Sequence, residues 1–329
     1  MSRLPAVPGA PGVVPGAELL VGARLVVAPE LSASLVRELE RISGRGAEPW
    51  GGAVADGRGP LLCVGAALPE ALRATDRLLW FHSVNAGTDP LLAAGPWPAN
   101  ALLTRTVGRM GERIAQYVLG WVLAECQAVP EHAAQHARAE WCRLPSELVA
   151  GQTALVYGTG RIGGAVAGLL RACGVRTVGV GRTVRTGPPP PGFDRVIGAE
   201  KDAEELAGAR WVVAALPSTG ATEGFFGARR FAAVRGATFV NVGRGATVDL
   251  GALEGALRGG GVRRAVLDVL AEEPAAPGDP VWRLPRTVIT SHSAGITADE
   301  DVAQDFAACW EAVWEGRRPE LAVDVERGY

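Results

Sequence analysis

The feature that most constrains the fold is an apolar strand pattern that leads directly into a glycine-rich turn and a helical pattern. The strand pattern covers residues 153–157, the helical pattern covers 161–172, and the turn reads Gly158-Thr159-Gly160-Arg161-Ile162-Gly163. In this GxGxxG spacing the first glycine allows a tight turn, the second lets the backbone approach a pyrophosphate, and the third lets the helix pack on the strand. Glycine-rich turns occur in other α/β proteins, but this strand–turn–helix context favours a dinucleotide site.

Short strand patterns alternate with helical patterns along most of the chain. Such alternation predicts an α/β fold with parallel sheets covered by helices on both faces, and 329 residues are enough for two domains. The remaining strands are predicted at 24–28, 61–65, 78–82, 175–180, 195–197, 211–215, 238–241, 265–268 and 287–290. The remaining helices are predicted at 31–42, 108–127, 249–258 and 298–314, and the apolar residues of 108–127 (Ile114, Val118, Trp121, Val122) form one wide face.

Composition excludes several classes of protein. The formal net charge is −2 and no block of Lys or Arg occurs, so neither nucleic acid nor a membrane surface is an expected partner. No apolar run reaches the roughly 18 residues of a membrane span, and the N-terminus lacks the apolar core of a signal peptide. The cysteines are odd in number and scattered, which predicts reduced thiols in a cytoplasmic protein and no zinc site: Cys63, Cys126, Cys142, Cys173, Cys309.

The strand after the glycine-rich turn bears on the choice of dinucleotide. Folds that bind NAD place a carboxylate about 20 residues after the glycines, where it binds the ribose 2′-hydroxyl. Here Gly181 stands at that position, and Arg182, Thr183 and Arg185 follow it. The two arginines can hold a 2′-phosphate by charge-assisted hydrogen bonds, with the Thr183 hydroxyl in support. We therefore predict a preference for NADP(H) over NAD(H), the alternative being two solvated arginines in an arginine-rich chain.

Three polar segments follow predicted strands further along the chain. Arg244 stands between two glycines, Asp268 is followed by the acidic pair Glu272 and Glu273, and His292 lies in the segment Thr-Ser-His-Ser-Ala-Gly. Ligands of open α/β sheets bind at the carboxyl ends of the strands, so one crevice can hold all three segments. An arginine displayed between glycines suits bidentate capture of a carboxylate.

The order of these motifs resembles the D-isomer-specific 2-hydroxyacid dehydrogenases. The patterns are GxGxxG at 158–163, NxGRGxxVD at 241–249, DVxxxEP at 268–274 and SHxAGxT at 291–297. Within that family the chain is similar to the glyoxylate/hydroxypyruvate reductase branch. The resemblance implies hydride transfer from a nicotinamide to C2 of a small 2-keto acid, which gives a D-2-hydroxy acid.

The resemblance also implies a role for each catalytic residue. Arg244 is expected to bind the substrate carboxylate and the C2 carbonyl oxygen, and His292 is expected to protonate that oxygen. Glu273 is expected to hydrogen-bond His292, and Glu272 is the alternative if the motif register is shifted. A carboxylate beside an imidazole favours the protonated ring, and a nearby guanidinium offsets negative charge on the reduced oxygen.

Other parts of the site follow from the same resemblance. Asp268 is expected to bind the nicotinamide carboxamide, and further cofactor contacts are expected from Val242, Leu216, Pro217 and Ser218. The backbone of Asn85, Ala86 and Gly87, in the loop 83–89, is expected to bind the substrate carboxylate. The sequence departs from the family at Ser291, where Pro is usual, and at Gln116-Tyr117, where Glu-His or Glu-Tyr is commoner.

The implied domain organisation is an insertion. A dinucleotide-binding domain at 104–292 would interrupt a substrate-binding domain formed by 1–103 and 293–329, with the active site in the cleft. The family also implies a homodimer packed through the nucleotide domains.

One alternative is a dehydrogenase for a specialised biosynthetic 2-keto acid, and another is a non-catalytic dinucleotide-sensing protein related to corepressors. The intact Arg244, Glu273 and His292 argue against the second alternative. A formate-dehydrogenase-like function is disfavoured because that branch pairs its His with Gln.

Several residues allow a structural and a functional interpretation. His132 and His136 have helical i, i+4 spacing, but without an obvious third ligand they favour a solvated face, and we expect no metal. His82 ends a predicted strand beside the carboxylate loop, where a packed or hydrogen-bonded role is favoured over substrate contact. Trp50, Trp97 and Trp141 lie in irregular segments, where core or interface packing is favoured over a wall of the substrate pocket.

Overall fold

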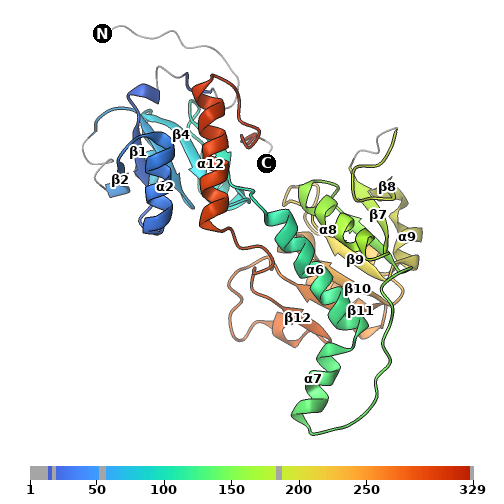
Figure 1. Ribbon diagram of the computed structural model, residues 1–329. Coiled ribbons are helices and arrows are strands. Elements are labelled where there is room, and N and C mark those ends of the chain that lie inside the picture. Colours follow the sequence, from blue (N-terminus) through green and yellow to red (C-terminus); the bar gives the residue numbers. More distant parts are fainter. Residues whose placement is uncertain (1–13, 17–19, 52–56, 183–186, 327–329) are drawn as a thin grey trace. The chain divides into compact units, whose positions relative to one another are not determined.

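The computed structural model describes residues 14–16, 20–51, 57–182 and 187–326 (Figure 1). It divides into two compact units, and each is described by itself below. Unit 1 comprises Met1–Arg109 and Thr297–Tyr329, and unit 2 comprises Met110–Ile296. Each unit is built on a parallel β-sheet, so the predicted fold class is confirmed.

Unit 1 has a five-stranded parallel sheet in the order β2-β1-β3-β4-β5. Helices α2 and α12 pack side by side on one face of it (Figure 1). On that face Trp80 stacks against Phe306 of α12, with 5.3 Å between ring centroids. Its strands are β1 (Arg24–Val27), β2 (Ala47–Pro49), β3 (Leu61–Gly65), β4 (Leu78–Ser83) and β5 (Leu102–Arg105). Its helices are α2 (Ala33–Ser43), α4 (Glu70–Arg73), α5 (Asp89–Ala93) and α12 (Asp299–Trp314).

Local sequence explains the limits of α2. The Ser32 hydroxyl accepts a hydrogen bond from the Leu35 N–H at 3.1 Å, which caps the start of the helix. Gly44 ends the helix in the left-handed conformation, where a residue without a side chain is favoured. The edge strand β2 was not predicted, since its three residues, Ala-Glu-Pro, carry no strand pattern.

Unit 2 has a seven-stranded parallel sheet in the order β12-β11-β10-β9-β6-β7-β8. Its strands are β6 (Thr153–Tyr157), β7 (Arg176–Gly181), β8 (Arg195–Gly198), β9 (Trp211–Ala214), β10 (Ala237–Asn241), β11 (Val262–Leu267) and β12 (Thr287–Ile289). Its helices are α6 (Met110–Cys126), α7 (Val129–Ala137), α8 (Arg161–Ala172), α9 (Asp202–Gly208), α10 (Ala228–Phe231) and α11 (Leu250–Arg258). The chain enters at β6, moves outward through β7 and β8, and returns to the other side of β6 at β9. The order therefore reverses between β6 and β9, the position where open α/β sheets bind ligands.

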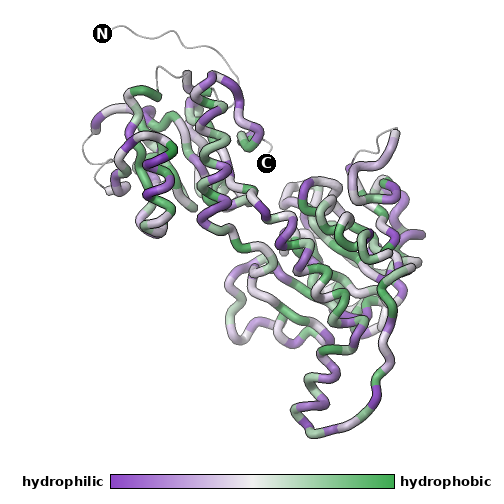
Figure 2. Tube along the Cα trace, viewed as in Figure 1, coloured by the Kyte–Doolittle hydropathy of each residue, from purple (hydrophilic) through white to green (hydrophobic). Residues whose placement is uncertain are grey.

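The core of unit 2 explains the apolar runs in the sequence. Central strands of a parallel sheet are covered on both faces, so the residues of β6, β9 and β10 are apolar and buried except Thr153, Thr238 and Asn241. Helix α8 buries one face against the sheet, and Figure 2 shows it as largely hydrophobic. Helix α6 buries Ile114, Val118 and Val122 as predicted, but Trp121 is half-buried and not part of that buried stripe.

Helix α7 and the connection at 138–150 form an arm that extends away from the sheet of unit 2 (Figure 1). No residue of α7 is buried, and Trp141 in the connection is 100% exposed. Of the two packing roles predicted for Trp141, packing in the core is therefore wrong, and packing in an interface stays a prediction. In unit 1, Trp50 and Trp97 pack edge-on against Phe81, which confirms a packing role for both. None of the helices in the described ranges has the length and apolar character needed to cross a bilayer.

Candidate active site

The carboxyl edge of the seven-stranded sheet carries the predicted site residues of unit 2. Arg244 follows β10, Asp268 follows β11 and His292 follows β12, and these three strands are neighbours in the sheet. Gly158 follows β6 and Leu216 follows β9, so the glycine-rich turn lies at the same edge. The predicted carboxylate loop with Asn85, Ala86 and Gly87 belongs to unit 1.

In the glycine-rich turn, main-chain atoms pack so closely that two of the positions cannot carry a side chain. Gly158 has a φ of +101°, and a Cβ at this position would lie 2.6 Å from the carbonyl oxygen of Ala215. A Cβ on Gly163 would lie 1.8 Å from the carbonyl oxygen of Gly158, so this residue must also lack a side chain. Gly160 differs, because a Cβ there would meet no atom within 4 Å. Two of the glycines therefore serve packing, and the third leaves open backbone at the start of α8.

That open backbone fits a phosphate group. Gly160 is the N-cap of α8 and supplies no side chain to cap the helix. A helix N-terminus presents N–H groups and positive partial charge, the two features that bind a pyrophosphate. Thr159 and Ile162 are half-buried beside it, whereas Gly160 and Arg161 are exposed. The residues present thus fit the phosphates of a dinucleotide.

The end of β7 carries the residues predicted to select the cofactor. Gly181 is the last residue of the strand, and Arg182, which follows it, is exposed. Thr183 and Arg185 lie outside the described residues. The prediction of a 2′-phosphate site therefore has structural detail only at Gly181 and Arg182.

His292 and Glu273 form a hydrogen-bonded pair. Nδ1 of His292 lies 2.8 Å from Oε2 of Glu273, and the other carboxylate oxygen accepts a hydrogen bond from the Leu270 N–H at 2.7 Å. The side chains of His292 and Glu273 are 52% and 35% exposed. Because Nδ1 is engaged by the carboxylate, Nε2 is the ring nitrogen that can reach a substrate.

Asp268 organises the turn that carries His292. Its carboxylate, in a residue only 3% exposed, accepts hydrogen bonds from the Thr290 hydroxyl at 2.6 Å and from the N–H groups of Ser293 and Ala294 at 2.8 and 3.1 Å. Its backbone carbonyl accepts from the His292 N–H at 2.6 Å. Sequence reasoning assigned Asp268 to the cofactor and missed Thr290. No local pattern gave a signal for this pair, because the burial of Asp268 and its contact with Thr290 arise only when β11 and β12 pair in the sheet.

Arg244 is half-buried, and its backbone is fixed by its neighbours. Its carbonyl oxygen accepts hydrogen bonds from the Thr247 hydroxyl at 2.6 Å and the Asn241 side-chain amide at 3.1 Å. A Cβ on Gly243 would lie 2.6 Å from the Leu216 carbonyl oxygen, and one on Gly245 would lie 1.8 Å from the Leu270 carbonyl carbon. The flanking glycines therefore do more than display the arginine, since they admit the segments that follow β9 and β11. Val242, which precedes Gly243, is buried, Leu216 is half-buried, and Pro217 and Ser218 are exposed.

In unit 1 the predicted carboxylate loop follows β4. Asn85 is exposed and Ala86 and Gly87 are half-buried, with the Ala86 carbonyl oxygen 3.3 Å from Nη1 of Arg105. His82, three residues before Asn85, is fully buried, and its ring nitrogens lie 2.8 and 3.1 Å from the hydroxyls of Thr104 and Thr106. Burial lowers the pKa of His82 to about 3. A packed and hydrogen-bonded His82, the favoured interpretation, is confirmed.

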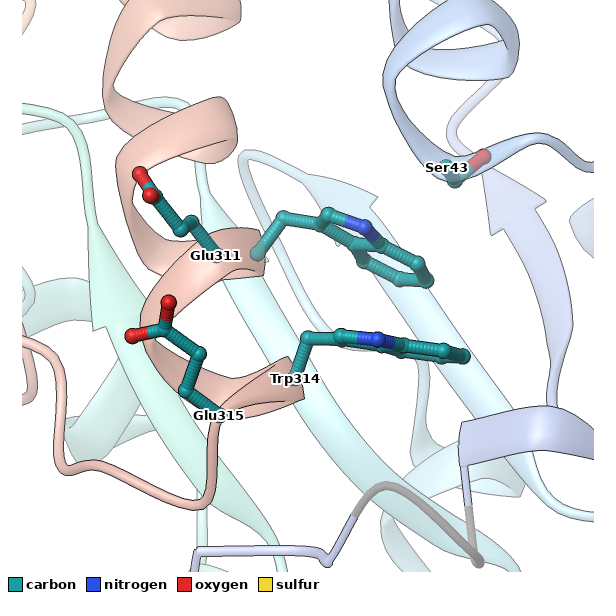
Figure 3. Close-up of a pocket in the computed structure, with 5 residues that line it drawn as sticks. Ser43, Glu311, Trp314 and Glu315 are labelled. Carbon is teal, nitrogen blue, oxygen red and sulfur yellow. The ribbon is translucent and has the colours of Figure 1, made fainter.

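Two further features of the described ranges do not involve predicted site residues. His132 and His136 are exposed on α7, and no group of three or more potential metal ligands occurs among the residues described. A shallow groove on unit 1 is lined by Ser43 and by Trp310, Glu311, Trp314 and Glu315 of α12. Figure 3 shows Trp314 on the side of α12 that faces Ser43, with Glu311 and Glu315 pointing away from it.

Comparison with known proteins gives a consistent result. A sequence profile described as the NAD-binding domain of D-isomer-specific 2-hydroxyacid dehydrogenases matches residues 119–294. A Streptomyces coelicolor protein, described as uncharacterized and encoded in the mprR 3′ region, is 60% identical over 270 residues, which are 82% of this chain and 96% of the relative. Glyoxylate/hydroxypyruvate reductase A of Serratia proteamaculans is 32% identical over 267 residues, which are 79% of this chain and 84% of the relative.

Solved structures show the same similarity. A D-isomer-specific 2-hydroxyacid dehydrogenase from Xanthobacter autotrophicus, crystallised with NADPH and MES, superposes with a TM-score of 0.81 at 28% identity. The alignment covers 94% of this chain and 100% of the other.

Proposed function

The chain belongs to the D-isomer-specific 2-hydroxyacid dehydrogenases, a family of NAD(P)-dependent enzymes, and from that premise we propose that it reduces a small 2-keto acid with NADPH. Glyoxylate and hydroxypyruvate are the proposed substrates; reduction of hydroxypyruvate gives the D-2-hydroxy acid, and reduction of glyoxylate gives achiral glycolate. The observation that carries the proposal is the pairing of His292 with Glu273 at 2.8 Å, at the sheet edge that also presents Arg244. The name of the Serratia relative and the NADPH bound to the Xanthobacter protein support it.

The proposed proton donor is His292. Glu273 occupies Nδ1, which orients the ring and leaves Nε2 to face the substrate. Nε2 then gives its proton to the C2 oxygen of the substrate as that oxygen gains negative charge. In the reverse direction the neutral ring accepts the hydroxyl proton.

Arg244 is proposed to bind the substrate. Its planar guanidinium suits a bidentate bond to the carboxylate, and its fixed charge stabilises the developing charge on the C2 oxygen. Backbone N–H groups of Asn85, Ala86 and Gly87 are proposed to bind the same carboxylate. Cofactor contacts are proposed for the turn 158–163 and for Leu216, Pro217, Ser218, Val242 and Asp268, and the bound nicotinamide supplies the hydride.

A panel of 2-keto acids tests this function. NADPH oxidation is followed with glyoxylate, hydroxypyruvate, pyruvate and larger keto acids. Efficient turnover of glyoxylate and hydroxypyruvate supports the proposal, whereas strong preference for a large keto acid favours the specialised biosynthetic alternative. Tight NADPH binding without turnover of any keto acid contradicts the proposed reductase activity and favours a sensing role.

NADP(H) preference is proposed from the end of β7, where Gly181 supplies no carboxylate and Arg182 is exposed. The measurement is kcat/KM with NADPH and with NADH. Arg182→Ala removes one charge beside the proposed 2′-phosphate, and we expect the preference for NADPH to fall about tenfold, the size of one charge-assisted hydrogen bond. Equal or better kcat/KM with NADH in the unmodified enzyme contradicts this assignment.

A homodimer is proposed from the arm of unit 2. Val129, Trp141 and Leu148 are large apolar side chains that are exposed on this segment, and exposed tryptophan is typical of protein interfaces. Sedimentation analysis should therefore give twice the chain mass, and Trp141→Ser should weaken the association. A monomer at micromolar concentration contradicts the dimer.

A cytoplasmic location is proposed from the cysteines. All five are free thiols, and Cys142 is exposed. Exposed thiols persist in a reducing compartment. Cell fractionation tests this location.

A further inference from the structure

The turn that carries His292 has an unfavourable backbone conformation. Ser291 and His292 have φ angles of 53° and 57°, in the left-handed region that residues with a side chain rarely adopt. Such conformations persist only where the surroundings hold them. Here the holding group is Asp268, which accepts hydrogen bonds from three successive N–H groups, those of His292, Ser293 and Ala294. The position of the His292 ring therefore depends on the position of Asp268.

Counting protons gives the direction of the next two hydrogen bonds. An ionised carboxylate can only accept, so the single hydroxyl proton of Thr290 is given to Oδ1 of Asp268. The Tyr117 hydroxyl lies 2.6 Å from the same Thr290 oxygen. Since Thr290 has no second proton, Tyr117 must be the donor. A directed chain of hydrogen bonds thus runs from Tyr117 through Thr290 to Asp268.

Helix α6 supports this chain along one face. Met110, Ile114 and Tyr117 are spaced by four and three residues, so they share a side of the helix. Met110 and Ile114 touch the end of the same turn, because a Cβ on Gly295 would lie 2.2 Å from Sδ of Met110 and 3.0 Å from Cγ1 of Ile114. The ring of Tyr117 packs edge-on against Trp121, which fixes its direction.

We propose that Tyr117 is a positioning residue, which anchors the Thr290–Asp268 pair to α6 and thereby holds His292 where it protonates the substrate. The catalytic part of this inference rests on the proposed function, whereas the anchoring of the turn does not. Burial raises the pKa of Tyr117 to about 12, so its hydroxyl remains a donor throughout the pH range of an assay. No sequence motif marks this role, because Tyr117 is 175 positions from His292 along the chain.

Kinetics of single and double variants test the catalytic part. Tyr117→Phe keeps the ring against Trp121 and removes the donor, and we expect kcat to fall about tenfold because small displacements of a reacting group are costly. KM for NADPH should change less than twofold. Thr290→Val should have a similar effect, and the double variant should be no worse than either single one, since both break the same chain. Additive losses, or an unchanged kcat in Tyr117→Phe, overturn the proposal.

Tyr157→Phe is the matched control. It also removes a hydrogen-bonding tyrosine hydroxyl from unit 2, but the fully buried Tyr157 donates to Asp202 at 3.1 Å and not to the His292 turn. We expect Tyr157→Phe to lower thermal stability without lowering kcat. Equal losses of kcat in both tyrosine variants would show a general effect of lost stability and overturn the proposal.

Amide hydrogen exchange provides a readout that needs no turnover. The N–H groups of His292, Ser293 and Ala294 should exchange at least tenfold faster in Tyr117→Phe than in the unmodified protein, while amides of β6 should not change. Unchanged exchange at these three amides overturns the anchoring. If no keto acid is turned over, the proposed function fails, yet exchange still decides whether Tyr117 anchors the turn.

Discussion

Two polar clusters lie at opposite edges of the seven-stranded sheet, and they use the same kinds of side chain differently. At the amino edge, Glu125 of α6 is 6% exposed and lies 3.1, 3.0 and 3.7 Å from nitrogens of Arg210, Arg263 and Arg264. The Thr238 hydroxyl adds a further bond to this carboxylate. At the carboxyl edge, Glu273 contacts His292, and both side chains remain about a third to a half exposed.

The difference lies in burial and in the number of partners. A buried carboxylate is costly unless several donors surround it, so the Glu125 cluster is fully engaged and fixed. The Glu273–His292 pair has one bond across it and an imidazole nitrogen left for a ligand. The same kinds of side chain therefore form a structural cluster at the amino edge and the proposed catalytic pair at the carboxyl edge.

The largest expected effect comes from changing the proposed catalytic pair. His292→Ala removes the proposed proton donor, and we expect kcat to fall by about 10³ or more, in the upper part of the range for general acids. NADPH affinity, measured by titration of cofactor fluorescence, should stay within twofold, because the glycine-rich turn is untouched. The free energy of unfolding should change by less than about 0.5 kcal/mol, since the side chain is half-exposed. A kcat near that of the unmodified enzyme would refute the acid role.

The structural cluster should respond in the opposite way. Glu125→Ala removes the buried carboxylate that the three arginines share, although Arg210 and Arg263 keep Glu147 and Arg264 keeps Glu131. We therefore expect the free energy of unfolding to fall by about 1–3 kcal/mol in urea denaturation. Activity per folded molecule should be kept. Glu254→Ala is the control, because Glu254 pairs with Arg258 on the exposed face of α11 and should cost less than about 0.5 kcal/mol. Equal costs for the two variants would remove the distinction between the clusters.

The buried His82 extends the comparison to a second histidine. Its pKa is lowered to about 3 in the folded chain by burial, while an unfolded histidine titrates near 6.5. Below about pH 6.5 the unfolded chain therefore binds one proton more, so stability falls as the pH falls towards 3. Between pH 6.5 and 5 this term amounts to about 2 kcal/mol. Urea denaturation of the unmodified protein and of His82→Gln at both pH values measures it, and an equal pH dependence in the two proteins would contradict it.

Much of the fold could be predicted from the sequence because parallel strands buried on both faces leave apolar runs that turns and helices interrupt. The pairing of Glu273 with His292 was suggested by motifs that each follow a strand. The hub at Asp268 could not be predicted, since it depends on the register that places Leu267 beside Ile289. The contact of Tyr117 with Thr290 depends on how α6 packs, and no local pattern encodes that. The exposure of Trp141 is equally invisible to local patterns.

Helix α6 has one consequence for how this protein can vary. Tyr117 contacts the turn that carries His292, and Glu125, eight residues later on the same helix, binds the arginine cluster. The helix therefore separates these two residues by about 12 Å along its axis. A single residue inserted between them would rotate one end by about 100° relative to the other. Substitutions on the outer face are thus easily absorbed, whereas a change in the length of this stretch disconnects either the charge cluster or the turn. The number of residues between Tyr117 and Glu125 is therefore constrained more tightly than their neighbours on the outer face of the helix.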